Sequence, residues 1–301
     1  MRTNTGRLST RRLWALSAAV LAGVGGAFAS VTTGETKATT RADHFLQARA
    51  APTTAMPPTA TASVTTESPV TTAGRPVVSP VLPFNAKLTS SDIPVRGGGV
   101  RSGACSGSLI APEWIITAGH CFHDINGAWV GGKPRYHMTV TVGKLKDGDP
   151  GGHTAQVVDV RQSPVNDLAV AKLSTAIDDV VPLTLPDKAP EVGQRLRFAG
   201  WGSTSATVVA PSDHLKRGEF SVAKIAPTTL EALPVVPRTV ENSPCADDSG
   251  SPYFVSGDNR TGNLVAIENS GPPCPQPGRE IIARVDILTD WIRTQTGDTA
   301  R

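Results

Sequence analysis

The sequence predicts an all-β domain, a barrel or a sandwich, that begins near residue 81. Short apolar or alternating runs recur from there, separated by Gly, Pro, Asn and Asp, and only the end of the chain has a helical pattern. Many short strands at such spacing are typical of all-β folds, whereas strands alternating with helices would indicate a parallel sheet. The clearest runs are HMTVTVG (137–143), TAQVVDVR (154–161), LAVAKL (168–173), RLRFAGWG (195–202) and GNLVAIE (262–268).

The last element is expected to be a helix. Ile287, Leu288, Trp291 and Ile292 recur at helical spacing, and Gly297 follows as a stop signal. The helix would therefore close the domain, which we expect to span residues 81–301.

Two segments precede this domain. Residues 1–29 have a basic front, an apolar run and small residues at Ala27 and Ala29, which predicts an export signal cleaved near Ser30. A membrane anchor is the alternative, but the run is marginal in length for spanning a bilayer. Residues 30–80 are rich in Thr, Pro, Ala and Ser, so we expect a disordered propeptide or linker. The mature protein should be secreted and free of the membrane.

Composition excludes several classes of function. The chain has 301 residues, 39% of them hydrophobic, which suffices for a sizeable core. Its net charge is +3 and its aromatic content 5%, without a concentrated basic face, so nucleic acid is not the expected partner. The histidines are scattered, so neither a metal site nor a cofactor is expected. Five of them are given no catalytic role: His44, His123, His137, His153 and His214.

Four cysteines in an exported chain indicate two disulfides. Sequence alone permits three pairings, of which Cys105 with Cys121 and Cys245 with Cys274 closes short local loops. Closing a loop of about 15 residues would stabilise the fold by roughly 3 kcal/mol on the chain-entropy model.

Three side chains could carry chemistry together. His120 follows the apolar run WIITA at a small-residue turn, Asp167 opens the run LAVAKL, and Ser249 stands in CADDSGSPYF before a strand. A serine hydroxyl becomes nucleophilic when a base accepts its proton, and an imidazole base needs a carboxylate to orient it. Standing alone, Asp167 would be a turn residue and the DDSG segment an acidic turn.

Five motifs in order resemble the trypsin and chymotrypsin-like serine proteases, over residues 81 to 295. They are TAGHC (117–121), NDLAVAKL (166–173), AGWG (199–202), CADDSGSP (245–252) and ARVDILTDWI (283–292). The resemblance implies two packed six-stranded antiparallel β-barrels, about 81–185 and 186–285, followed by a short C-terminal helix. The active site would lie in the cleft between the barrels.

The resemblance also implies the roles of the site residues. Ser249 would attack the peptide carbonyl, His120 would move the proton, and Asp167 would fix the imidazole tautomer. The backbone N–H groups of Ser249 and Asp247 would form the oxyanion hole. The implied protein is a monomeric serine endopeptidase that acts on proteins or peptides, and the cysteine pairs 105–121 and 245–274 match the family.

The segment around Ser249 departs from the family pattern. Asp247 stands where the family has glycine, and its negative charge would oppose the charge that develops in an oxyanion hole. Asp248 matches the aspartate that pairs with a newly cleaved terminal ammonium, as in a zymogen. The expected mature start is missing, however, and Pro76 hinders cleavage after Arg75. Either another protease processes this region or Asp248 has a different partner.

Substrate specificity is expected from three positions. Ser243 matches the floor of the family's specificity pocket, so the acid of trypsin-type enzymes is missing there. Glu280 matches a glycine in the pocket wall. A carboxylate at that position would favour Lys or Arg at P1, with aromatic side chains tolerated. A slip of one residue would instead point Arg279 inward, and Glu280 could also be a solvated loop residue. The segment 268–271, with Ser270, would pair with the substrate backbone.

A second hypothesis is a protease-like binding or adhesion module of weak or no activity. It is motivated by Asp247 and by the altered substrate-facing segment. Retention of His120, Asp167 and Ser249 favours the enzyme.

Overall fold

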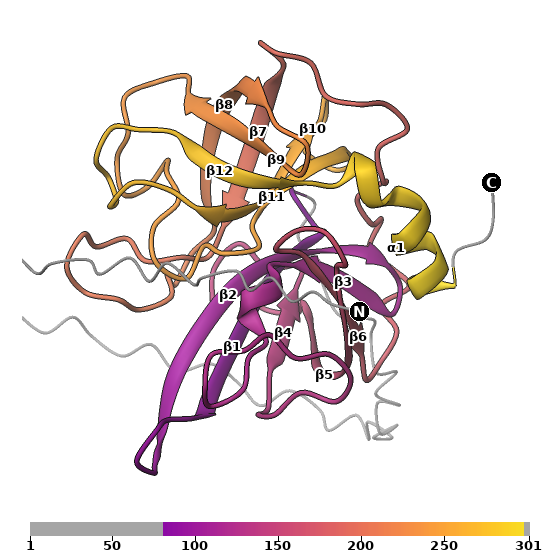
Figure 1. Cartoon of the computed structure of the whole chain (residues 1–301), viewed down its shortest axis with the longest axis vertical. Helices are drawn as coiled ribbons and strands as arrows, with labels where there is room; N and C mark the ends of the chain where they lie inside the picture. Colours follow the sequence, from indigo (N-terminus) through magenta and orange to yellow (C-terminus); the bar gives the residue numbers. More distant parts are fainter. Residues whose placement is uncertain (1–80, 298–301) are drawn as a thin grey trace, which may run out of the picture. The chain divides into compact units, whose positions relative to one another are not determined.

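Antiparallel pairing organises the residues that the computed structural model describes, which are 81–297. Twelve strands within that range close into two barrels of six strands each, which confirms the predicted fold class (Figure 1). The expected export signal (1–29) and the Thr/Pro-rich segment (30–80) lie outside the described residues.

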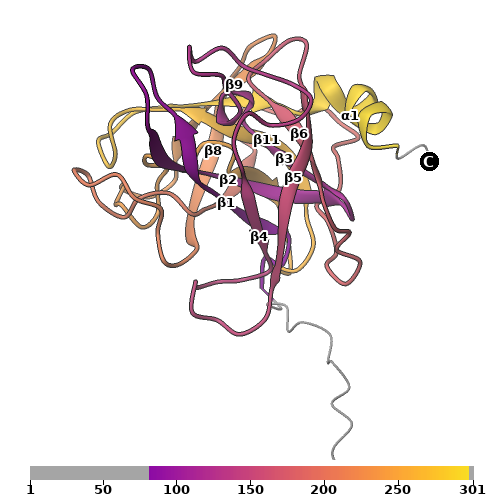
Figure 2. The same ribbon diagram turned by 90° about the horizontal axis from the view of Figure 1, so that it is seen from below.

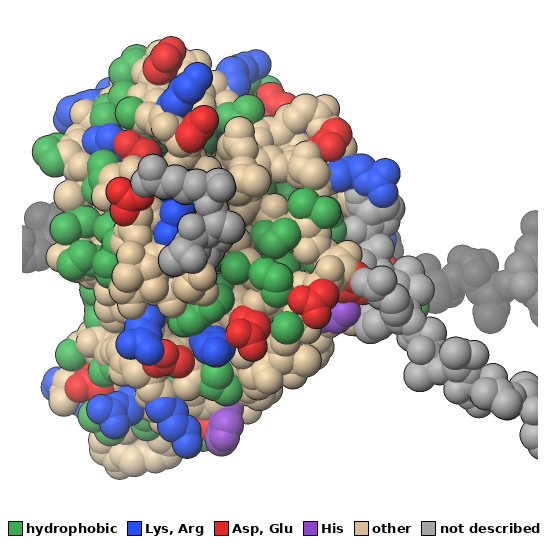
Figure 3. Space-filling view, turned by 90° about the vertical axis from the view of Figure 1, so that its right-hand side faces the viewer, with side chains coloured by type: hydrophobic (Ala, Val, Ile, Leu, Met, Phe, Trp, Pro, Cys, Tyr) green, Lys and Arg blue, Asp and Glu red, His purple; other side chains and the backbone are tan. Residues whose placement is uncertain are grey.

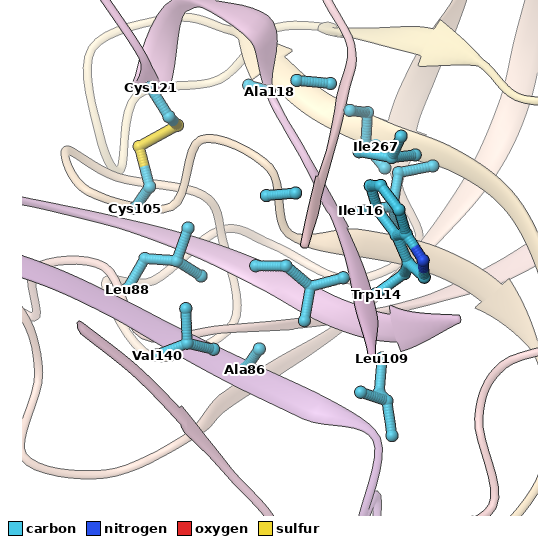
Figure 4. Close-up of a cluster of buried hydrophobic side chains, with 14 of the residues drawn as sticks. Ala86, Leu88, Cys105, Leu109, Trp114, Ile116, Ala118, Cys121, Val140 and Ile267 are labelled. Atoms are coloured by element: carbon cyan, nitrogen blue, oxygen red, sulfur yellow. A yellow bond between two sulfur atoms is a disulfide. The ribbon is translucent and has the colours of Figure 1, made fainter. Parts of the chain in front are cut away.

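The first barrel closes because β1 pairs with both β2 and β4, in the order β1-β2-β3-β6-β5-β4. Leu88 and Val140 are partners across the β1–β4 pair, and both are fully buried. Figure 4 shows them near Ala86, with a disulfide beside this cluster. The strands are β1 (Asn85–Pro94), β2 (Val100–Ala111), β3 (Trp114–Thr117), β4 (Thr139–Val142), β5 (His153–Gln162) and β6 (Ala169–Leu173).

The second barrel has the order β10-β11-β12-β9-β8-β7. Its interior holds the rings of Phe198, Phe220 and Tyr253, whose centroids lie 5.3 to 6.0 Å apart in edge-on or tilted arrangements. Such aromatic packing buries much apolar area in few residues. The strands are β7 (Arg195–Gly200), β8 (Lys216–Ile225), β9 (Thr229–Pro234), β10 (Pro252–Val255), β11 (Asn263–Ser270) and β12 (Glu280–Arg284).

Buried contacts join the two barrels, which lie one above the other in Figure 1 and overlap in the view of Figure 2. The Phe84 ring meets the Phe254 ring edge-on at 5.2 Å between centroids. The Trp201 indole N–H donates to Asn85 Oδ1 at 2.7 Å, so the polar tip of this buried ring has a partner. The packing fixes one barrel against the other and thereby fixes the geometry of any site between them.

The C-terminal helix α1 (Thr289–Thr296) follows a 3-10 turn, η2 (Asp286–Leu288). Ile292 is fully buried, and Gly297 ends the helix in the left-handed conformation (φ 72°), as the sequence predicts. Ile287 is 40% exposed because it lies in the 3-10 turn and not in the helix proper. No helix within residues 81–297 is long and apolar enough to cross a membrane. Figure 3 shows acidic and basic side chains interspersed on one face of the molecule.

Candidate active site

His120 lies in a 3-10 turn, η1 (Gly119–Cys121), directly after β3. A side chain at position 119 would displace its neighbours, because an added Cβ would lie 2.6 Å from Gln162 Oε1 and 3.0 Å from Asp167 Oδ1. The Gln162 side-chain amide, at the end of β5, donates to the Gly119 carbonyl at 2.9 Å. The imidazole therefore projects from a short turn of the first barrel, and Gln162 and Asp167 pack against that turn.

The Asp167 carboxylate binds both the backbone and the ring of His120. Oδ1 accepts the His120 backbone N–H at 2.9 Å, and Oδ2 lies 2.7 Å from Nδ1. Asn269, on β11 of the second barrel, donates its side-chain N–H to the Asp167 carbonyl at 2.6 Å. Because Nδ1 donates to the carboxylate, Nε2 of the neutral ring is the proton acceptor.

Ser249 belongs to a loop of the second barrel that docks on the first barrel. Its carbonyl accepts the Ser106 N–H from β2 at 2.8 Å. Gly250 has φ 85°, and an added Cβ would lie 2.1 Å from Thr117 Oγ1. Only glycine permits this approach and this conformation, which bring the serine close to the end of β3, three residues before His120.

His120 and Ser249 line the same cavity, whose volume is about 330 Å³. Among the described residues, Ser249 Oγ has no hydrogen-bond partner and does not bond to His120. Catalytic hydrogen bonds are often long in unliganded sites and tighten when substrate is bound. The structure thus places His120, Asp167 and Ser249 near one another, with a hydrogen bond between His120 and Asp167 and none between His120 and Ser249.

The backbone around Asp247 presents amide donors. The Ala246 carbonyl accepts the Ser203 N–H at 2.7 Å. Since carbonyl and N–H point in opposite directions across a trans peptide, this bond turns the Asp247 N–H away from Ser203. Neither the Asp247 nor the Ser249 N–H has an acceptor within residues 81–297. Two N–H donors without a partner among these residues, one of them the serine's own, are thus present here, and an oxyanion hole is built from such donors.

The Asp247 side chain is the anomaly that the sequence indicates. Its backbone is left-handed (φ 70°), the region that favours glycine. The Asp247 side chain lies beside β2, where it lines a cavity together with Gly103 and Ala104. Burial raises the pKa of the Asp247 carboxyl, and the charge of Asp248 raises it further.

Asp248 is fully buried and its cationic partner is a lysine. Oδ1 accepts the Gly202 N–H at 2.7 Å, and Oδ2 accepts the Cys245 N–H at 2.9 Å. The ammonium of Lys216, at the start of β8, lies 2.6 Å from Oδ2. Of the two alternatives left open by the sequence, the structure shows a partner for Asp248 inside the second barrel.

Ser249 also borders a second cavity of about 370 Å³, whose walls come from the serine loop, the end of β11 and the start of β12. Glu280 lies in its wall with 0% exposure, its carboxylate against Gly271. Glu280 pairs with the buried guanidinium of Arg238, while Glu280 Oε2 has no partner among the described residues. Burial raises the pKa of Glu280 to about 7, and Arg238 is the largest influence in the opposite direction.

A second carboxyl, Glu268, borders the same cavity. It accepts the Tyr253 hydroxyl at 2.8 Å, and burial, followed by the charge of Glu280, raises the pKa of Glu268 well above its usual value. Two buried carboxyls therefore lie in the wall of this cavity, and the buried Arg238 cation pairs with one of them, Glu280.

The other predicted specificity residues fall in different places. Ser270 lines the second cavity. Ser243, expected at the floor, does not line it; this serine is fully buried and its carbonyl accepts Lys216 at 2.9 Å. Arg279 points outward and pairs with Glu231, so it does not enter the cavity.

Sequence reasoning missed Lys216 and Arg238. One signal was available for the first, because period-two alternation along β8 places Lys216 on the same face as the buried Phe220. Arg238 lies between β9 and β10 with no local pattern that indicates burial.

Both expected cysteine pairs are disulfides in the structure. Cys105–Cys121 joins β2 to the turn that holds His120, across a sequence separation of 16 residues. Cys245–Cys274 joins the serine loop to the segment after β11, across 29 residues.

Comparison with known proteins gives consistent similarities. A family model described as Trypsin matches residues 72–292. Kallikrein 1-related peptidase b5 of Mus musculus is 26% identical over 215 residues, which cover 63% of this chain and 78% of the relative. Snake venom serine protease catroxase-1 of Crotalus atrox is 28% identical over 213 residues, 63% and 76% of the two chains. Snake venom serine protease homolog rhinocerase 3 of Bitis rhinoceros is 27% identical over 209 residues, 62% and 75%.

Proposed function

The chain belongs to the trypsin family of serine proteases, and from this premise we propose that it is an exported serine endopeptidase whose catalytic residues are His120, Asp167 and Ser249. The observation that carries the proposal is the pairing of His120 Nδ1 with Asp167 in a cavity that Ser249 also lines. This pairing leaves Nε2 available to the serine hydroxyl. Protein or peptide substrates follow from the family.

The reaction would proceed through an acyl-enzyme. Ser249 Oγ attacks the scissile carbonyl as His120 Nε2 takes its proton, and Asp167 stabilises the imidazolium that forms. The free N–H groups of Ser249 and Asp247 bind the oxyanion. His120 then protonates the leaving amine, and water, activated by the same imidazole, releases the acid product and restores Ser249.

The second cavity is the proposed P1 pocket. Glu280 Oε2 is buried against Gly271 in the wall of this space and has no partner among the described residues, so a lysine or arginine side chain that displaced this contact would supply the missing hydrogen bond. An aromatic side chain could fill the same space without using the carboxylate.

Labelling with a fluorophosphonate tests the nucleophile. The wild-type chain should be modified at Ser249, whereas Ser249→Ala should remain unlabelled and Asp167→Asn should react at least 100-fold more slowly because the imidazole loses its orienting carboxylate. A matched control exists, because His137 and Asp92 form an exposed pair with the same atoms, Nδ1 to Oδ2 at 2.6 Å and backbone N–H to Oδ1 at 3.0 Å. His137→Ala should therefore label like wild type, and His120→Ala should not.

The alternative is a protease-like binding module, favoured by the left-handed Asp247 and by the open contact between His120 and Ser249. A wild-type chain that stays unlabelled at every pH and also fails to cleave casein would support this alternative.

Export is tested separately, by N-terminal sequencing of protein recovered from the culture medium. A terminus near residue 30 is expected.

A further inference from the structure

We propose that Lys216 is a positioning residue that supplies, from within the second barrel, the cation required by Asp248, so that the catalytic site forms without cleavage of the N-terminal segment. The inference rests on the proposed peptidase function. Under this proposal, the enzyme does not need cleavage of the segment before residue 81 in order to become active.

The Lys216 site is complete. An ammonium group has three protons, and three acceptors surround this one: the carbonyls of Ser203 (3.1 Å) and Ser243 (2.9 Å) and Oδ2 of Asp248 (2.6 Å). The side chains of Lys216 and Asp248 are both 0% exposed. A new terminal ammonium would have to displace a saturated, fully buried lysine in order to reach the carboxylate.

This ion pair also controls the oxyanion donors. Lys216 binds the Ser203 carbonyl, and Asp248 binds the N–H of Gly202, so the pair holds both sides of one short segment. The same segment holds the Ala246 carbonyl through the Ser203 N–H, and that bond directs the Asp247 N–H away from Ser203. Loss of Lys216 would leave a buried carboxylate without its cation and would release this chain of contacts.

The first test uses the full chain, with an intact mass showing that its N-terminal segment is present. Its α-amino group is acetylated, and fluorophosphonate labelling and ester hydrolysis are compared before and after limited proteolysis of the segment. The rates of labelling and of ester hydrolysis should agree within about twofold before and after proteolysis. An intact or acetylated chain that is inert, and that gains 100-fold or more when cleavage exposes a new terminus, would overturn the inference.

The second test separates positioning from mere stability. Lys216→Met should lower kcat by about 100-fold with KM changed only a few-fold, because oxyanion donors act mainly on the transition state. Lys216→Arg, which keeps the charge, should recover part of the rate.

Lys87 provides the matched control: it is 7% exposed in the first barrel and binds both oxygens of Asp147 (2.8 and 2.7 Å) and the Ser212 carbonyl (2.8 Å).

Lys87→Met should lose stability yet keep its rate per folded molecule. A folded Lys216→Met with wild-type kcat would refute the inference. If that variant does not fold, the acetylated intact chain decides the question alone. A wild-type chain that is unlabelled both intact and cleaved refutes the proposed peptidase function itself, and this inference falls with it.

Discussion

Preference for basic P1 residues should rise with pH because of Glu280. Its pKa is about 7, so the carboxyl is about one-tenth ionised at pH 6 and about nine-tenths ionised at pH 8. A hydrogen bond from a P1 guanidinium to the ionised form is stronger than one to the neutral acid. The specificity ratio, kcat/KM for a P1-Arg peptide over that for a P1-Phe peptide, should therefore increase severalfold between pH 6 and pH 8, with about tenfold as the ceiling that ionisation sets over this interval.

The ratio isolates Glu280 from His120, because protonation of the catalytic imidazole changes both substrates equally. The assay measures kcat/KM for the two peptides, identical except at P1, between pH 5.5 and 8.5. Glu280→Gln should flatten the ratio, and adding Arg238→Gln to it avoids leaving a buried unpaired guanidinium. Arg238→Met alone removes a cation that lowers the pKa of Glu280, so the rise should move to higher pH.

A ratio that does not change with pH in the wild-type chain, or one that Glu280→Gln leaves pH-dependent, would refute the reasoning. Cleavage restricted to small aliphatic P1 residues would remove the assignment of this cavity to P1 altogether.

Three further outcomes are expected. Asp247→Gly should raise kcat, since glycine suits φ 70° and removes a carboxylate beside the oxyanion donors; an unchanged or lower kcat contradicts this. Replacing Cys105 and Cys121 by alanine should cost about 3 kcal/mol of unfolding free energy in urea and slow labelling, and retention of full stability would show that the disulfide adds little. In a Ser249→Ala background, Tm should fall as pH rises from 5 to 8. Because the pKa of Glu280 is raised in the folded state, the folded chain keeps a proton there that the unfolded chain has already released. The stability that this proton adds is lost as the pH rises through about 7, and Glu280→Gln should reduce the slope of Tm against pH.

Local pattern predicted the secondary structure well, because alternation along a strand follows directly from which face is buried. Five residues of the run LAVAKL (169–173) form β6, RLRFAG is β7, and the closing helix ends at the predicted Gly297. Ile287 differs because the chain enters the helix through a 3-10 turn, which changes the face that this residue presents.

Motif order predicted which residues meet, but not what balances their charges. Ser243 illustrates the limit: its carbonyl accepts a hydrogen bond from the Lys216 ammonium, a contact that its position relative to Ser249 does not indicate. Sequence spacing reports distance along the chain and carries no information on side-chain direction after a turn.

The sequence by itself determined the two barrels, the candidate triad and the cysteines available for pairing, because each leaves a local or ordered trace in the residues. Only the tertiary structure decided that Lys216 meets Asp248 and that Arg238 meets Glu280. The physical reason is that a buried charge selects its partner by proximity in space, and these partners come from segments 32 and 42 residues apart whose approach is set by closure of the second barrel.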